Sequence, residues 1–101
     1  MREAQIVLPQ TMTAQPAIEL RKALLAAFGG YTEHVATGAW RNPATEIVHR
    51  DHHTVFTVAG EPWQWHEVAG AAITAGRMAK QICIYARDFD GNVHFLDCKG
   101  G

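Results

Sequence analysis

The chain has 101 residues, of which 48% are hydrophobic and 19% charged, the composition of a globular protein long enough for one core and too short for two. Nine Lys and Arg stand against ten Asp and Glu, and the net charge of −1 disfavours general nucleic-acid binding, which needs a positive field. The apolar run Ile6, Val7 and Leu8 is too short for a signal peptide or a membrane span, so we expect no membrane association and a cytoplasmic location.

The first part of the chain predicts a short strand and a helix. Pro9 ends the strand of residues 6–8, because proline cannot donate to a strand ladder. Pro16 suits the first turn of a helix, and Gly29 with Gly30 supplies its end. Apolar residues between them recur at three- and four-residue steps, which is the period of one buried helix face: Ala17, Leu20, Leu24, Leu25 and Phe28.

A long hairpin is expected next. Residues 31–41 mix β-formers with small residues, and Pro43 occupies the second position of a type I turn at residues 42–45. The return strand covers residues 46–59, ends in a β-prone run at 55–58, and is stopped by Gly60. Its length allows a bend or bulge near Asp51.

A second helix is expected from Glu61 and Pro62 onward. Small residues along its apolar stripe, Ala69, Ala72 and Gly76, would let the helix lie close to the sheet. We therefore interpret Gly76 as a packing residue rather than a place where a ligand approaches the backbone.

The last two strands, residues 81–87 and 93–97, form a hairpin around Asp90 and Gly91. A two-residue turn at that dipeptide predicts three facing pairs: Tyr85 with Leu96, Arg87 with His94, and Cys83 with Cys98. In this register the two thiols face one another in a geometry where a disulfide would be strained and easily reduced.

The order of elements predicts one α+β domain over residues 1–101. The expected architecture is a two-layer, ferredoxin-like βαββαβ sandwich with an extra C-terminal hairpin strand and two helices on one face of a mainly antiparallel sheet. The other face would carry Tyr85, Leu96 and Cys98 with Arg87 and His94, which is too apolar for free exposure. We expect a homodimer formed through this face or through an edge strand.

Two short motifs carry a resemblance. The segments FGGYT at residues 28–32 and GAWRNP at 38–43 resemble a group of small uncharacterised bacterial and phage proteins with an FGG(Y/F)T and GxWR(D/N)P pattern. The resemblance covers most of the chain from Ala23 onward and implies a ferredoxin-like α+β fold and a frequent location on mobile elements, without implying an activity. The chain departs from the pattern at Glu46, where Gly often stands, and in its histidine cluster at residues 49–53.

That cluster is the candidate metal site. His49, Asp51 and His53 fall on one face of the expected strand, with neighbouring side chains about 7 Å apart. Two imidazoles and a carboxylate, with His34 across the hairpin, could bind a transition metal such as zinc, nickel or iron and activate a water molecule. The alternative is a set of solvated side chains at the polar end of a long hairpin.

Aromatic residues mark the candidate binding positions. Trp63 and Trp65 flank the start of the second helix, so one indole either faces solvent as an anchor or both clamp the helix start. Trp40 beside Arg41 can hold a carboxylate or phosphate, or stack within the turn. Together with the open-face side chains, the candidate binding residues are Trp40, Arg41, Trp63, Tyr85, Arg87 and His94.

Catalytic motifs are missing from the sequence. It contains no serine, which rules out serine hydrolase chemistry, and no Walker loop, HExxH motif, dinucleotide fingerprint or CxxC pair. We therefore expect a non-enzymatic, dimeric interaction module that binds a protein or a small ligand and, by analogy, a phage- or mobile-element-encoded inhibitor of a host defence system. Two alternatives stay open: a metal-binding protein or metal-dependent enzyme using His49, Asp51 and His53, and a ligand pocket walled by Trp40, Trp63 and Tyr85.

Overall fold

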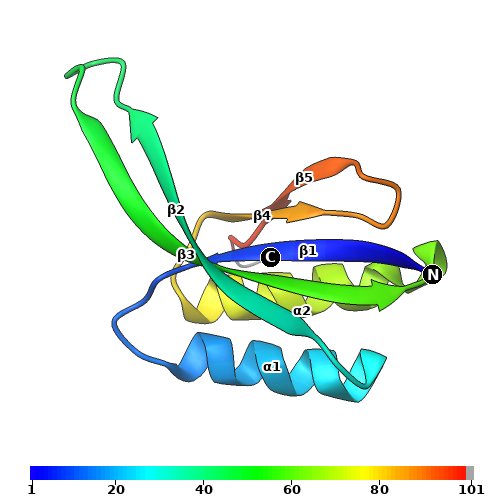
Figure 1. Cartoon of the computed structure of the whole chain (residues 1–101). Helices are drawn as coiled ribbons and strands as arrows, with labels where there is room; N and C mark the ends of the chain where they lie inside the picture. The colour runs from blue at the N-terminus through cyan, green and yellow to red at the C-terminus, as the bar shows by residue number, and fades with distance from the viewer. Residues whose placement is uncertain (100–101) are drawn as a thin grey trace.

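A computed structural model describes residues 1–99 and shows one antiparallel sheet covered on one face by two helices (Figure 1). The strands are β1 (Arg2–Pro9), β2 (Thr32–Arg41), β3 (Val48–Gly60), β4 (Cys83–Arg87) and β5 (Val93–Asp97). The helices are α1 (Gln15–Phe28) and α2 (Trp65–Met78), the latter preceded by the short 3-10 helix η1 (Pro62–Gln64). The strand order is β2-β3-β1-β4-β5. The α+β class, the antiparallel sheet and the helix layer on one side of it are confirmed.

The core lies between the sheet and the helices, with β1 at its centre. Alternate β1 residues Ala4, Ile6 and Leu8 are buried toward the helices, where Leu20 and Leu24 of α1 meet them. Full burial of such a side chain stabilises the fold by roughly 1.5–3 kcal/mol. Strand β1 is longer than the expected strand of residues 6–8, because β3 and β4 pair with it on its two sides.

Within residues 1–99, none of the helices is both long and apolar enough to cross a membrane.

Helix α1 ends as expected. Gly29 adopts φ 75°, in the left-handed region, and its N–H donates to the carbonyl oxygen of Leu25. Glycine reaches this conformation without the steric cost that a Cβ adds.

Helix α2 lies very close to the sheet at Gly76, which confirms the packing interpretation. A Cβ at this position would stand 2.6 Å from Cγ1 of Ile84 and closer still to the Sγ of Cys98. Gly70, on the same helix, has open space where its Cβ would be.

This difference makes a matched test. Gly76→Ala is expected to destabilise the fold by about 1–3 kcal/mol through overpacking, since Ile84 and Cys98 must move. Gly70→Ala is expected to stabilise it by about 0.5–1 kcal/mol, the usual gain of alanine over glycine inside a helix. Denaturant unfolding of both variants at one protein concentration measures the two changes. Equal stabilities for the two variants would contradict the close approach at Gly76.

The register expected for the C-terminal hairpin is wrong by one residue. The structure pairs Arg87 with Val93, Tyr85 with Phe95 and Cys83 with Asp97. The turn is a longer loop, closed by the N–H of Asp88 donating to the carbonyl oxygen of Asn92 at 2.9 Å, and Gly91 within it adopts φ 86°.

Tertiary packing explains the correction. Phe89 is buried, and its ring lies 6.2 Å from that of Phe28, next to Gly60, whose missing Cβ leaves room for both rings. A tight turn at Asp90 and Gly91 would have left Phe89 in the ladder. The longer loop instead frees it to fold into the core.

A slip of one residue moves every side chain of a strand to the opposite face. His94, Leu96 and Cys98 therefore belong to the helix side, and Phe95 belongs to the other face. Cys98 is buried and Cys83 exposed, so the facing pair of thiols expected from the sequence does not form. Burial also raises the pKa of the Cys98 thiol.

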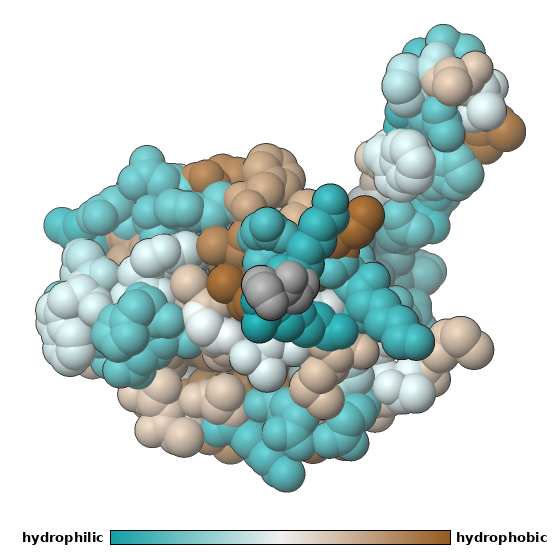
Figure 2. Space-filling model, turned by 180° about the vertical axis from the view of Figure 1, so that it is seen from behind, coloured by the Kyte–Doolittle hydropathy of each residue, from teal (hydrophilic) through white to brown (hydrophobic). Residues whose placement is uncertain are grey.

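The far part of the β2–β3 hairpin, residues 37–52, projects from the rest of the molecule; we call it the arm (Figures 1 and 2). β1 ends at Pro9 opposite His53, so the pairs from Thr37–His52 to Arg41–Val48 have no third strand beside them. The hairpin is confirmed and its turn lies where it was expected, but the turn is longer than the four-residue type I turn of residues 42–45. The N–H of Glu46 donates to the carbonyl oxygen of Asn42, four residues earlier, and the return strand begins at Val48 rather than at residue 46.

The arm's turn has one strained residue. Glu46 donates its N–H to the carbonyl oxygen of Asn42 and adopts φ 60°, a conformation that glycine enters easily and other residues rarely.

Candidate functional site

The sheet face without helices, which we call the open face, carries a row of side chains across all five strands that is aromatic or aliphatic on β5, β4, β1 and β3 and ends with a histidine on β2. Register places Phe95, Tyr85, Val7, Val55 and His34 side by side, in that order. The rings of Tyr85 and Phe95 meet edge to face with centroids 5.7 Å apart. Phe95 is nevertheless 71% exposed, a large fraction for a phenylalanine in a sheet.

The candidate residues from the sequence divide between the two faces. Tyr85 and Arg87 lie on the open face, and Arg87 pairs with Gln5 of β1. His94 does not join them, because the corrected register turns it to the helix side, where its ring packs 4.7 Å from that of Trp65. Trp63 projects outward and is 71% exposed, so one indole faces solvent and the other packs inward.

Trp40 and Arg41 both lie on the arm. The indole of Trp40 stacks on the imidazole of His49, with ring centroids 4.6 Å apart, and its Nε1 donates to Oδ2 of Asp51 at 3.2 Å. Arg41 pairs with Glu46, with 3.7 Å between Nη1 and Oε2, at the exposed surface. Trp40 therefore does stack, but on His49 of β3 rather than within the turn as the alternative expected.

The proposed metal ligands share a face but do not converge. His49 stacks on Trp40, and Asp51 accepts a hydrogen bond from the same indole. Across residues 1–99, no three His, Cys, Asp or Glu side chains are grouped so that they could hold a metal ion. A metal would have to draw His49 and Asp51 away from their present partners.

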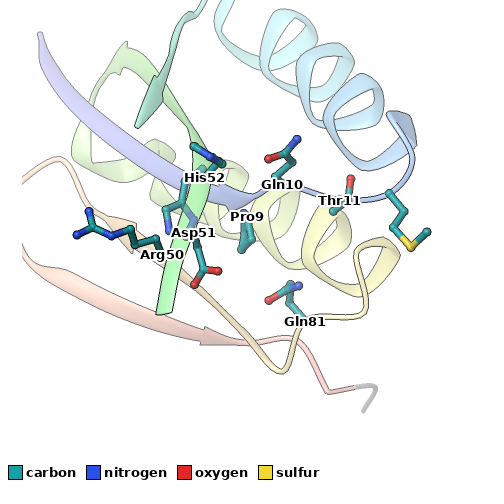
Figure 3. A pocket seen from close by; sticks show the side chains of 9 residues that line it. Pro9, Gln10, Thr11, Arg50, Asp51, His52 and Gln81 are labelled. Carbon is teal, nitrogen blue, oxygen red and sulfur yellow. The ribbon is translucent and has the colours of Figure 1, made fainter. Parts of the chain in front are cut away.

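A pocket of about 740 Å³ lies at the base of the arm (Figure 3). Three separate segments line it: the chain leaving β1, the start of β3, and the turn before β4. The N–H of Gln10 donates to the carbonyl oxygen of His52 at 2.9 Å and holds the first two segments together. The lining residues are Pro9, Gln10, Thr11, Met12, Arg50, Asp51, His52, His53 and Gln81.

His53 is the unusual member of this pocket. Its Nδ1 is buried and has no hydrogen-bond partner among the residues that the structure describes. The ring fits there because Gly38 stands beside it, where a Cβ would come within 3.1 Å of Nε2. Gln10, Thr11 and Gln81 were not singled out from the sequence, and no local pattern marks them, since only the fold brings their segments together.

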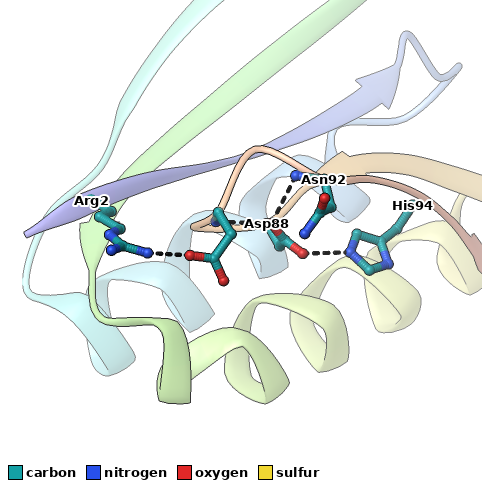
Figure 4. Close-up of polar contacts among 5 residues, drawn as sticks. Arg2, Asp88, Asn92 and His94 are labelled. Carbon is teal, nitrogen blue, oxygen red and sulfur yellow. Dashed lines mark hydrogen bonds and ion pairs between the residues drawn. The ribbon is translucent and has the colours of Figure 1, made fainter.

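A polar cluster stands at the other end of the molecule, in the β4–β5 loop (Figure 4). One oxygen of Asp88 accepts the N–H groups of Asp90 and Asn92, both at 2.9 Å, while the other lies 2.8 Å from Nε2 of His94. Arg2 of β1 pairs with Asp90. The hydrogen bond with His94 is the main cause that lowers the pKa of Asp88 to about 2.

This shift has a defined effect on stability. A carboxyl whose pKa is lower in the folded state than in the unfolded chain stabilises the fold at pH values above its ordinary pKa, 3.8. This contribution is lost as the pH falls from 3.8 toward about 2. Asp88→Asn keeps an oxygen for the backbone but has no charge. The stability difference between the wild type and Asp88→Asn is therefore expected to shrink as the pH falls through this window, from 3.8 toward about 2.

Unfolding experiments at a series of pH values measure that difference, with Asp97→Asn as a control for a charge lost from the same hairpin. Parallel stability curves for the wild type and Asp88→Asn down to the lower end of the window would contradict the assignment.

Comparison with known proteins finds likeness only at the level of fold. No family model and no curated protein matches the chain. Its structure is similar to a phage SAM lyase in complex with S-methyl-5'-thioadenosine, with a TM-score of 0.69, 9% identity and coverage of 94% of this chain and 88% of that one. The same phage enzyme in its apo state gives a TM-score of 0.66 at 8% identity, covering 98% and 90% of the two chains.

A Bacillus cereus protein related to NIF3 is also similar, with a TM-score of 0.64 and 17% identity. The match covers 95% of this chain but 25% of that protein. At these identities the likeness shows a shared fold and does not carry an activity with it.

Proposed function

We propose that this chain is a non-enzymatic interaction module that works as a homo-oligomer assembled through the open face. The observation that carries the proposal is the row on that face, where Phe95 is 71% exposed beside Tyr85 on the side that neither helix covers. Removing such a ring from water is worth roughly 1.5–3 kcal/mol, which favours burial by a partner. A second copy presents the same row and so provides a matching apolar surface.

The fold interpretation belongs to the same proposal. The order β2-β3-β1-β4 places one antiparallel strand between β1 and β2 and another between β3 and β4, each pair joined through a helix. This arrangement supports a ferredoxin-like sandwich with β5 added at the edge.

Two equally exposed aromatic residues allow a controlled test of assembly. Phe95→Asp puts a charge in the proposed interface, and sedimentation is expected to shift from an assembled species to the 11.1 kDa monomer. Trp63→Asp, at a residue that is likewise 71% exposed but lies on η1, is expected to leave the mass unchanged. A wild-type monomer at tens of micromolar, or assembly of Phe95→Asp like the wild type, would contradict the proposal.

Within this class we propose an inhibitor of a host defence system encoded by a phage or mobile element. The FGGYT and GAWRNP motifs and the fold shared with a phage protein support this role. The same variants test it in bacteria that carry a defence system. Plating of a restricted phage is expected to rise when the wild type or Trp63→Asp is expressed and to stay low with Phe95→Asp.

A second candidate function is small-ligand binding at the base of the arm. His53 favours it, because this residue lines the pocket there and its buried Nδ1 has no partner among the described residues. Such an atom costs about 1–3 kcal/mol, and a turn of the ring toward the pocket would let a ligand satisfy it. The adjoining pocket of about 740 Å³ is large enough for a nucleoside. Since a phage enzyme of the same fold was solved with S-methyl-5'-thioadenosine, this nucleoside is the first probe.

Calorimetric titration with S-methyl-5'-thioadenosine tests the ligand hypothesis. Saturable binding is expected for the wild type, with at least a tenfold loss of affinity, about 1.4 kcal/mol, in His53→Ala. His66→Ala, an exposed histidine of α2 that does not line the pocket, serves as the control. Absence of binding to the wild type at millimolar ligand would exclude this nucleoside.

A further inference from the structure

The arm exposes apolar side chains among the residues that the structure describes. Trp40 is 51% exposed and Ile47 56%, and none of residues 37–52 is buried. An isolated two-stranded ribbon is at best marginally stable in water, and three strands or a packed surface are needed to hold it. The arm has neither within one copy of the chain.

The arm and the open face border the same space. In Figure 1 the arm leaves the sheet on the side away from α1 and α2. Register puts Trp40 and His49, facing each other across the arm, on the same sheet face as Val55 and Tyr85. The bend of the arm therefore makes this continuous face concave, with the open face as one wall and the arm as the other.

The open face alone is too small for a specific interface of standard size. Outside the arm the five strands are five to eight residues long and about 4.8 Å apart, which gives a footprint of roughly 500 Å². A specific interface of standard size uses about 800 Å² on each partner. The arm is the adjoining surface of the right chemistry, with an indole that is rigid and largely apolar.

We infer that a second copy of this chain occupies the concave surface, so that the arm of each copy lies against the body of its partner. The inference rests on the proposed self-association and names the element that completes the interface. Assembly then supplies the packed surface that the ribbon lacks, and the arm supplies the area that the open face lacks. Trp40 becomes buried in the assembly.

Removal of the arm is the direct test. Ala36 and His53 are directly paired, so replacing residues 37–52 by Asn-Gly closes the hairpin at that pair. The variant is expected to keep a cooperative unfolding transition, since no buried residue is removed, and to assemble with a dissociation constant at least tenfold higher than that of the wild type in sedimentation equilibrium. Trp40→Ala is expected to weaken assembly in the same direction, and Trp63→Ala is not.

The outcomes separate the two proposals. A monomeric wild type overturns the self-association and this inference together. Loss of assembly in Phe95→Asp, with unchanged dissociation constants in the armless variant and in Trp40→Ala, overturns the inference alone and leaves the arm free for another partner. If the armless variant does not fold, Trp40→Ala against Trp63→Ala decides.

Discussion

Two hydrogen bonds from backbone N–H groups to one carboxylate oxygen of Asp88 fix the geometry on which the rest of the surface depends. They hold the β4–β5 loop in the shape in which Phe89 packs into the core, and these contacts and the packing of Phe89 together set the register of β5. The register in turn decides that Phe95 faces the uncovered side and Cys98 the helices. The chemistry of the open face therefore depends on a polar contact at the edge of the sheet.

Single residues were sufficient to predict the ends of helices and the places of turns wherever one residue type has one physical role. Pro16 and Gly29 gave the limits of α1, and Asn42 with Pro43 gave the turn of the arm. The β5 register could not be predicted in this way, because the Asp-Gly dipeptide favours a tight turn. Only the folded structure shows that Phe89 packs beside Gly60, where the missing Cβ leaves room for its ring. The packing of Phe89 in the folded molecule therefore outweighed the preference of the Asp-Gly dipeptide for a tight turn.

The candidate sites show the same division. Alternation along β3 correctly put His49, Asp51 and His53 on one face, but alternation says nothing of what each side chain meets, and Trp40 engages the first two. The pocket at the base of the arm depends on three segments that are far apart in the sequence. Tyr85 and Arg87 were placed correctly because β4 holds its own alternation, whereas His94 inherited the error in register.

Because the arm is separate from the core, its residues can be substituted during evolution more freely than those of the body. No residue of the arm contributes to the buried cluster, and its pairs beyond His53 are independent of β1. Substitutions there alter the local opening of the ribbon while leaving the global free energy of unfolding to the body. Even Glu46, which adopts a left-handed backbone conformation, can be replaced by glycine, and the replacement would change the stiffness of the arm's turn. The tip is therefore free to drift or to adapt to new contacts at little risk to folding.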